Sequence, residues 1–341
     1  MLEGLDLAKV GPWLEANVEG AVGPFDASLI GGGRSNLTFT VTGADGTKFV
    51  LRRPPLGHVL ATAHDMAREF KIIAAVGKTS VPVPSALGLC TDPEVNGAPF
   101  YVMGHVEGVV LDSPQRAAAL PPALRQKASD HLIDVLADLH AVDIDEVGLG
   151  DLARREGYIE RQVKRWSTQW ANSKTRELPA IDEVARRLGE RLPVQQGAVI
   201  AHGDYRFGNC LTDVDAGRVA AVLDWELCTL GDPLADVGYL GVYWTDPGVP
   251  TRRHNDPSGA EGFATYDELM ERYAARTGRD VSGIAYYVAF SSWRLAVISE
   301  GVYARYLHGA MGDGLDPSVL DTFKTGTEQL AESALDAVRR L

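Results

Sequence analysis

One stretch, residues 200–239, constrains the fold more than any other part of the chain. It contains an H-G-D motif that ends at Asp204, then Asn209 five residues later, and then Asp224 at the end of an apolar run. Gly217 predicts a turn between two short strands. That hairpin would bring the side chains of Asp204, Asn209 and Asp224 close together at one site.

These three side chains suit phosphoryl transfer. Asp204 is the candidate catalytic residue, because its carboxylate can accept a proton from a substrate hydroxyl. Asn209 and Asp224 offer hard oxygen ligands for Mg²⁺, which itself binds nucleotide phosphates. The order D-x-x-x-x-N followed by a strand-borne aspartate matches the kinase catalytic loop and metal-binding aspartate. Each residue alone fits an ordinary hairpin turn, but their order and spacing together favour a kinase site.

The stretch resembles the aminoglycoside phosphotransferase-like family, a branch of the protein-kinase-like fold that carries H-G-D-x-x-x-x-N where protein kinases carry H-R-D. The family's metal-binding aspartate is commonly followed by an aromatic residue, here Trp225, and then by G-D-P-x-x-D, here residues 231–236. The resemblance covers nearly the whole chain and is strongest to kinase-like domains fused to, or encoded beside, acyl-CoA dehydrogenases. It implies an α+β, bilobal fold. We expect a β-rich nucleotide-binding lobe over residues 1–104 and a mainly helical catalytic and substrate lobe over residues 105–341, with ATP between them.

Polar residues near the motif are interpreted as structural supports of the site rather than as residues that take part in the reaction. In kinase-like folds an aspartate at the position of Asp236 hydrogen-bonds the catalytic-loop backbone, and we place His202 beside it in the same supporting role. Asp232 is a candidate helix N-cap. His140 ends an apolar helical pattern and is interpreted as a packed, structural histidine, because Asp204 already fills the role of proton acceptor.

A glycine-rich turn lies between two predicted strands near the N-terminus. Gly32 and Gly33 are candidates for phosphate contact, because glycines let backbone N–H groups approach phosphates closely. The turn departs from G-x-G-x-x-G, since Asn36 stands where a third glycine would be. In the resembled family, Ser35 and Asn36 are expected to make part of the phosphate contact.

Alternation along the strand predicted over residues 48–53 puts Val50 and Arg52 on one face. By analogy with the kinase pattern V-A-I-K, Val50 would face the adenine and Arg52 the phosphates, with arginine in place of lysine. Lys48, two residues earlier on the same face, is the alternative phosphate-binding residue. A solvated Arg52 at the strand end is also compatible with the sequence.

Two further elements complete the predicted nucleotide site. Glu69 lies on a helix predicted over residues 61–76 and would pair with the phosphate-binding base, as in kinases. A surface ion pair with neighbouring basic residues is the alternative for Glu69. Residues 101–106 fall where the kinase hinge belongs, with Met103 and His105 as candidates for contact with the adenine.

Candidate substrate contacts share aromatic or cationic character. Arg294 and Arg305 lie on a helix predicted over residues 285–307, eleven residues and three turns apart, so they share a face. The alternative to substrate binding is that the aromatic residues of this set pack in the core and the charged ones lie on the surface, which fits the sequence equally well. The candidates for a substrate wall are Arg206, Trp244, Trp293, Arg294 and Arg305.

Composition excludes some classes of partner. The chain has 33 basic and 46 acidic residues, a formal charge of −13, which argues against general nucleic-acid binding. Three cysteines without metal-ligand spacing do not predict a disulfide framework. No signal peptide or membrane-length apolar run is recognised, so no membrane association and a cytoplasmic location are the expectations.

The preferred function is therefore phosphorylation of a small-molecule hydroxyl, with ATP and Mg²⁺ as cofactors. A nucleotide-binding regulatory module without turnover remains open. A protein kinase is disfavoured, because Asp236 follows Asp224 by twelve residues and leaves no room for a long activation loop. An aminoglycoside kinase is disfavoured by the lack of an acidic cluster for a polycation. The resemblance implies a hydroxylated acyl acceptor, such as a CoA thioester, and a functional link to an acyl-CoA dehydrogenase.

Overall fold

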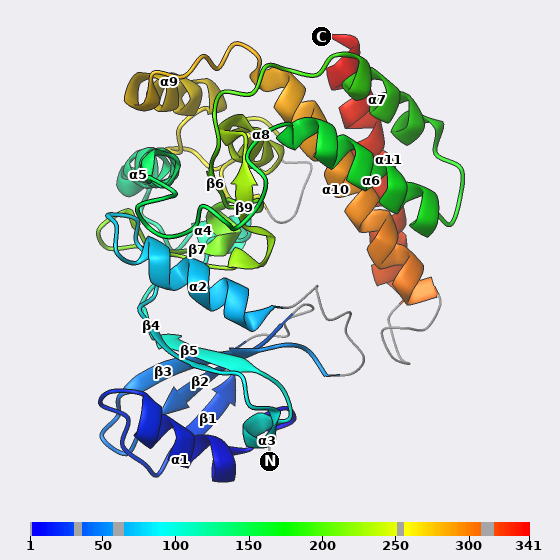
Figure 1. Ribbon diagram of the computed structural model, residues 1–341. Helices are drawn as coiled ribbons and strands as arrows, with labels where there is room; N and C mark the ends of the chain where they lie inside the picture. The colour runs from blue at the N-terminus through cyan, green and yellow to red at the C-terminus, as the bar shows by residue number, and fades with distance from the viewer. Residues whose placement is uncertain (1, 31–35, 57–64, 251–255, 308–316) are drawn as a thin grey trace.

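The N-terminal lobe is built on a five-stranded antiparallel sheet with the order β1-β2-β3-β5-β4 (Figure 1). The structure is a computed structural model that describes residues 2–30, 36–56, 65–250, 256–307 and 317–341. The inner strands β3 and β5 contain short continuous apolar runs, the pattern of strands covered on both faces, whereas the edge strand β1 is largely exposed. Their bounds are β1 Asp26–Leu29, β2 Leu37–Thr42, β3 Lys48–Arg53, β4 Ala86–Cys90 and β5 Phe100–Gly104.

The two faces of this sheet have different neighbours. Phe49 and Leu51 of β3 join an apolar cluster that includes buried Leu14 of α1 (Leu7–Asn17). Val50, on the opposite face, joins the larger core together with Met66 and Ile73 of α2 (Met66–Val76). Alternation along β3 thus separates the outer face, under α1, from the inner face, which looks toward the second lobe. The short helix α3 (Pro93–Asn96) connects β4 to β5.

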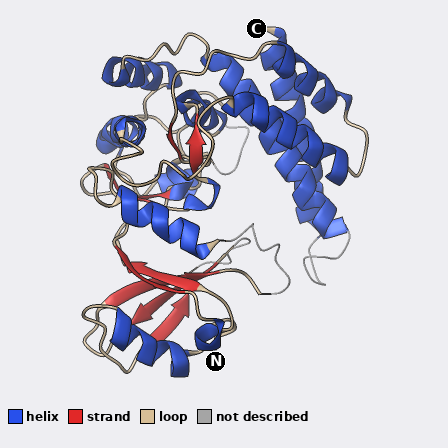
Figure 2. Cartoon of the chain, in the orientation of Figure 1, coloured by secondary structure: helices blue, strands red, loops and turns tan. Residues whose placement is uncertain are grey.

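The second lobe is mainly helical, as Figure 2 shows. Its longest helices, α10 and α11, pack against each other along one side of the lobe (Figure 1). The central helix α5 carries Leu132, Leu136 and Leu139 at helical spacing, and all three are fully buried. The bounds are α4 Pro114–Ala117, α5 Pro122–Ala141, α6 Tyr158–Ser173, α7 Pro179–Glu190, α8 Pro233–Val242, α9 Tyr266–Thr277, α10 Ile284–Leu307 and α11 Pro317–Arg339.

Two small antiparallel sheets of the second lobe pack against α5, α6 and α8 and position the motif residues. One pairs β6 (Val199–Ala201) with β9 (Thr229–Gly231), and the other pairs β7 (Cys210–Asp213) with β8 (Arg218–Val222). Gly217 lies at the β7–β8 turn with a φ of 60°, where a side chain would also meet Leu124. The predicted hairpin is therefore present. Single turns of 3₁₀-helix, η1 (Phe207–Asn209) and η2 (Trp225–Leu227), flank it.

The expected α+β, bilobal fold is confirmed. Strand β5 ends at Gly104, the residue at which the expected division of the lobes falls. In the part of the chain that the structure describes, no helix combines the length and the apolar character needed to cross a membrane.

Candidate active site

The candidate catalytic loop, residues 202–209, runs from the end of β6 to the start of β7. Asn209 Nδ2 donates to Asp204 Oδ2 over 2.7 Å and to the Asp204 carbonyl oxygen over 2.8 Å. Arg206 Nε lies 3.4 Å from Asp204 Oδ1 on the other side. The two neighbours hold the Asp204 carboxylate in a defined orientation while its side chain stays 21% exposed. The sequence spacing D-x-x-x-x-N is thus realised as a direct contact.

Asp224 follows β8 and turns the chain sharply. Its φ of 64° is the only positive φ of a non-glycine residue in the described part of the chain. The preceding residue, Leu223, donates its N–H to the Asn209 carbonyl oxygen over 2.8 Å, which brings the aspartate beside the catalytic loop. The hairpin therefore brings Asp204, Asn209 and Asp224 together, as the sequence predicts.

Arg52 connects the N-terminal sheet to Asp224, the residue that lies beside the candidate catalytic loop. Its Nη2 donates to Asp224 Oδ1 over 2.6 Å, and its Nε donates to Glu69 Oε2 over 3.0 Å. Glu69 is 2% exposed and also accepts a hydrogen bond from the Tyr101 hydroxyl. The pair between Arg52 and the helix glutamate is present, whereas the solvated Arg52 and the surface Glu69 are both excluded.

Burial and charge oppose each other in this pair. Burial disfavours the charged Arg52 guanidinium, but Glu69 and Asp224 outweigh it and raise the pKa of Arg52. Burial also raises the pKa of Glu69, with Arg52 acting in the opposite direction. Arg52 thus stays cationic between two carboxylates, one from each lobe.

Asn36 and Glu226 extend the network. Asn36 Nδ2 donates to Glu69 Oε1 and to Glu226 Oε2, each over 3.2 Å. Its Oδ1 is buried and has no hydrogen-bond partner among the described residues. Glu226 also lies 3.7 Å from Arg52 Nη2. Sequence reasoning missed Glu226, whose position two residues after Asp224 was its only signal. The candidate loop residues Gly32, Gly33 and Ser35 lie outside the described residues.

The donor set of the loop fits a divalent cation of the magnesium type. Asn209 uses its Nδ2 on Asp204, so the amide oxygen is the atom suited to a metal. Asp224 adds a carboxylate. Among the described residues there is no cluster of three or more His, Cys, Asp or Glu side chains arranged for a metal. Two protein oxygens suit a Mg²⁺ ion that completes its shell with phosphate and water, and not a closed structural site.

A family model described as a phosphotransferase enzyme family matches residues 26–273. The chain belongs to this phosphotransferase family. Mouse acyl-CoA dehydrogenase family member 10 is 35% identical over 322 residues, which cover 93% of this chain and 29% of the mouse protein. The chain spans only 29% to 40% of the length of the curated relatives it matches. The predicted resemblance to kinase-like domains associated with acyl-CoA dehydrogenases is confirmed.

Solved structures of phosphotransferases share the fold. An aminoglycoside phosphotransferase candidate from Ralstonia eutropha is 32% identical, with a TM-score of 0.82 and 98% coverage of both chains. Choline kinase from Cryptosporidium parvum is 14% identical, with a TM-score of 0.64 over 98% of this chain and 96% of the kinase. At that identity the similarity to choline kinase concerns the fold alone.

The residues predicted to support the site contact the backbone of the candidate catalytic loop. Asp236 accepts the N–H groups of His202 and Gly203 over 2.6 and 2.7 Å. His202 Nε2 contacts the Leu223 carbonyl oxygen over 2.9 Å, so its ring joins the loop to β8. His140 is buried between Asp236 and the Tyr273 hydroxyl, the packed environment expected for it. These contacts hold the loop backbone, and none of them involves the Asp204 carboxylate.

Burial and hydrogen bonding determine the protonation of Asp236 and His140. Burial alone would raise the pKa of Asp236, but hydrogen bonds from His140 and from the Gly203 amide outweigh it and lower that pKa. Burial lowers the pKa of His140, against the opposing effect of Asp236. A neutral histidine beside an ionised aspartate is the resulting state. Asp232 caps α8, as expected, by accepting the Leu234 N–H.

The predicted adenine contacts lie on and after the inner face of the sheet. Val50 and Met103 are partners across β3 and β5, and both belong to the core cluster on that face. His105 follows β5, with its Nδ1 3.6 Å from Glu107 Oε1. Lys48 is half-exposed and lies 3.8 Å from the same exposed glutamate, so it does not reach the Asp224 network. Arg52, and not Lys48, occupies the position next to the catalytic loop.

Two of the predicted substrate contacts are wrong. Trp293 is fully buried, and its Nε1 donates to the Ile181 carbonyl oxygen of α7. Trp244 is buried as well, stacks on Phe207 and donates to the Ala264 carbonyl oxygen. Both indoles fill the core because their large apolar area gains most from burial. Neither forms a substrate wall.

The cationic candidates have three different environments. Arg206 remains beside Asp204 and lies over the Tyr243 ring, 4.8 Å from its centroid. Arg294 is 6% exposed and donates to the Gly203 carbonyl oxygen over 2.6 Å. Arg305 is exposed further along α10, roughly 16 Å from Arg294 by helix rise. The shared helix face therefore does not make the last two arginines neighbours.

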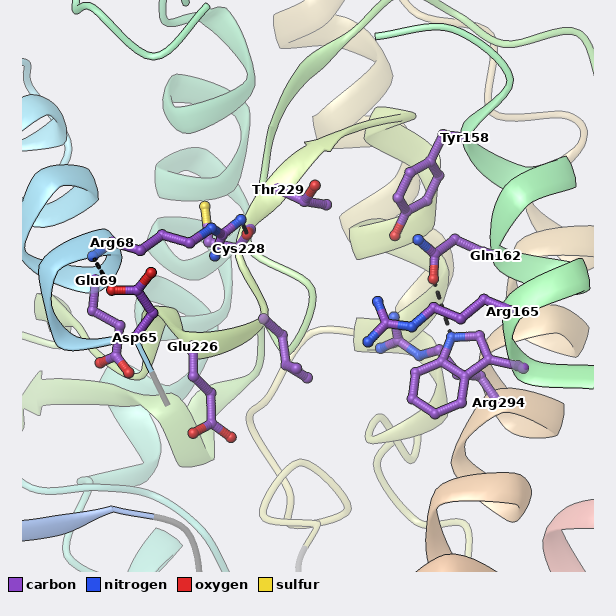
Figure 3. A pocket seen from close by; sticks show the side chains of 12 residues that line it. Asp65, Arg68, Glu69, Tyr158, Gln162, Arg165, Glu226, Cys228, Thr229 and Arg294 are labelled. Atoms are coloured by element: carbon purple, nitrogen blue, oxygen red, sulfur yellow. Dashed lines mark hydrogen bonds between the residues drawn. The ribbon is translucent and has the colours of Figure 1, made fainter. Parts of the chain in front are cut away.

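A cavity of about 210 Å³ opens between α2, α6, α10 and residues 226–229. Figure 3 shows Asp65, Glu69 and Glu226 on one side of it and Arg165 and Arg294 on the other. Arg68 reaches across toward β9, with its Nη2 2.5 Å from the Cys228 carbonyl oxygen. Sequence reasoning did not assign Arg68 to the site, because only the packing of α2 against η2 brings it there.

Proposed function

We propose that this phosphotransferase transfers the γ-phosphoryl group of ATP to a hydroxyl group of a small molecule, with Mg²⁺. The observation that carries the proposal is the assembly of Asp204, Asn209 and Asp224 around one loop, with Arg52 directed at it from the N-terminal sheet. A carboxylate for the hydroxyl proton, oxygen ligands for a cation and a fixed positive charge for phosphate are the parts that phosphoryl transfer needs.

In the proposed reaction the substrate oxygen forms a bond to the γ-phosphorus as the bond to the β–γ bridging oxygen breaks, which yields ADP. Asp204 accepts the hydroxyl proton, and Asn209 keeps its carboxylate oriented through the 2.7 Å hydrogen bond. Asn209 and Asp224 would hold Mg²⁺, which supplies neutralisation of phosphate charge. Arg52 would turn from Asp224 to the phosphates, where its planar guanidinium can pair with two oxygens.

We further propose a hydroxylated acyl group, free or as its CoA thioester, as the acceptor. A cavity of about 1010 Å³ lies between α10 and α11, with apolar side chains such as Leu295, Ile298 and Val302 along it. Tyr243 borders this cavity and also lies under Arg206, which neighbours Asp204. An acyl chain could thus lie in the cavity with its hydroxyl near the carboxylate. The relatives named as acyl-CoA dehydrogenases support this acceptor and a functional link to such an enzyme.

The test is incubation of the protein with Mg²⁺-ATP and matched acceptors, followed by mass spectrometry of the products. The panel holds hydroxyacyl-CoAs, free hydroxy acids, sugars, amino alcohols and aminoglycosides. We expect a mass gain of one phosphoryl group on a hydroxyacyl compound, and none in a control with the Asp204→Asn variant. Absence of phosphorylated product from every acceptor would favour the regulatory module without turnover.

A further inference from the structure

Arg294 is a buried cation that lacks an acidic partner. It is 6% exposed, and its guanidinium lies over the Tyr239 ring, 4.6 Å from the centroid. Its Nη2 donates to the Gly203 carbonyl oxygen, but its buried Nε has no hydrogen-bond partner in the described part of the chain. No ion pair joins it to an aspartate or glutamate among those residues. Buried charges are normally paired, so this one indicates a missing anion.

The surroundings of Arg294 have room for that anion. Arg294 borders the cavity between α2, α6 and α10, and Arg165 of α6 borders it on the same side (Figure 3). Arg165 lies over Trp166 and forms no ion pair among the described residues. Gln162 and Tyr158 add polar atoms to this wall. Two guanidinium groups and neutral donors form the chemistry that recognises a carboxylate or a phosphate.

The acids of the cavity lie on its other wall and are engaged there. Glu69 pairs with Arg52, and Glu226 accepts from Asn36. Asp65 accepts the Arg68 N–H at the start of α2. The wall toward the Arg52 network thus carries all three acids of the cavity together with Arg68, whereas the charged side chains on the wall formed by α6 and α10 are the cations Arg165 and Arg294. An anion would bind on the second wall.

We propose that Arg294 and Arg165 form a subsite for an oxyanion, a carboxylate or a phosphate group, carried by the phosphoryl acceptor. The proposal rests on the proposed kinase function and adds a substrate class to it. Arg294 also holds the carbonyl oxygen of Gly203, the residue before Asp204. An acceptor anchored at this arginine would therefore lie beside the catalytic loop, where its hydroxyl can be presented to the carboxylate.

The experiment is titration calorimetry of the whole chain, without nucleotide, with three matched three-carbon compounds. Glycerate carries a carboxylate, glycerol 3-phosphate carries a phosphate, and glycerol carries neither. We expect at least one anion to bind about tenfold or more tightly than glycerol, and the better of the two identifies the oxyanion. Arg165→Gln and Arg294→Gln should each weaken that binding by about tenfold, because a hydrogen bond to a charged group is lost. Arg294→Lys should lose less.

Lys164→Gln is the matched control, because it removes the same charge from the next, exposed position of α6, outside the cavity. If Arg294→Gln fails to fold, the exposed Arg165 position decides the outcome. Equal affinities for all three compounds, no binding of either anion, or equal effects of Arg165→Gln and Lys164→Gln would overturn the proposal.

Turnover separates this inference from the kinase function. Anion binding without phosphoryl transfer to any hydroxyl would contradict the proposed function and leave the subsite standing. Transfer to neutral alcohols as efficient as transfer to anionic ones, and unchanged in Arg165→Gln, would contradict the subsite and leave the function standing.

Discussion

Arg52 Nη2 lies 2.6 Å from Asp224 Oδ1, so a side chain of the N-terminal sheet neutralises the carboxylate that we assign to the metal. The same guanidinium holds Glu69 of α2 at 3.0 Å. One arginine thus joins a strand, a helix and the turn after β8 that carries Asp224. Mg²⁺ and ATP together would replace this contact, because the cation would bind Asp224 and the phosphates would bind Arg52.

The first prediction concerns this exchange. ATP should stabilise the protein well only together with Mg²⁺, because ATP alone brings its phosphates toward Asp224 without a cation between them. Thermal melting with ATP, with Mg²⁺ and with both measures the effect, since a ligand that binds the native state raises the melting temperature. Equal stabilisation by ATP with and without Mg²⁺, or none in either case, would contradict the assignment of Asn209 and Asp224.

The second prediction separates Arg52 from Lys48. Arg52→Ala should weaken ATP binding and reduce the free energy of unfolding by about 3 kcal/mol, because it leaves the buried Glu69 without its ion pair. Arg52→Lys should retain much of the ATP affinity. Lys48→Ala is the matched control, with a loss below about 1 kcal/mol, because its ion pair is exposed. Urea unfolding and nucleotide titration provide both quantities. A larger loss of ATP affinity in Lys48→Ala than in Arg52→Ala would reverse the assignment.

The third prediction distinguishes the proton acceptor from the metal ligand. Asp204→Asn keeps the shape and a hydrogen-bonding group but removes the base, so it should lower turnover by roughly 10²–10⁴-fold and leave Mg²⁺-ATP affinity nearly intact. Asp224→Asn weakens a metal ligand and should lower both. The measurements are nucleotide affinity and phosphorylated product for the wild type and the two variants. Wild-type turnover in Asp204→Asn would mean that the H-G-D motif has only a structural role here.

The fourth prediction concerns pH. Because the pKa of His140 is lowered in the folded state, the unfolded chain takes up the proton first as the pH falls below about 6.5. The free energy of unfolding should therefore decrease between pH 7 and pH 5.5, by at most about 1.4 kcal/mol per pH unit for one site. Urea midpoints across this range measure it. The lowered pKa of Asp236 adds a further loss only below about pH 4.

Variants of two histidines test the source of that pH dependence. His140→Gln retains a donor for Asp236 but cannot titrate, so its stability should change less with pH. The pKa of the half-buried His131 is also lowered, chiefly by burial, and His131→Gln is therefore the comparison variant. A pH dependence that disappears in His131→Gln and persists in His140→Gln would show that His131, and not His140, is its source.

The fifth prediction concerns aminoglycosides. We expect no useful phosphorylation of kanamycin-like compounds, because a polycation would meet Arg165 and Arg294 in the cavity beside the loop. Expression in a sensitive bacterium should leave the growth-inhibitory concentration unchanged, with an Asp204→Asn strain as control. Resistance that requires Asp204 would contradict the acceptor class proposed here.

The sequence by itself determined the local part of the site. A D-x-x-x-x-N spacing closes a single loop, and a glycine turn between two short apolar runs closes a hairpin, so Asp204, Asn209 and Asp224 could be placed together without coordinates. Strand alternation likewise placed Val50 and Arg52 on one face, since the period of a strand is two. These relationships depend on a few consecutive residues and on backbone geometry alone.

Tertiary packing decided the rest. Trp244 and Trp293 were candidate substrate contacts because exposed tryptophans often bind ligands. Residue type does not reveal whether a side chain faces the solvent or the core, and both side chains lie in the core. Asn36 meets Glu69, 33 positions away in the same lobe, and Glu226, 190 positions away in the other lobe, only because these elements pack together. Arg294 became a candidate anion-binding residue through its burial without an acidic partner. Burial and pairing are properties of the assembled core, since every element contributes to the exclusion of water from such a side chain.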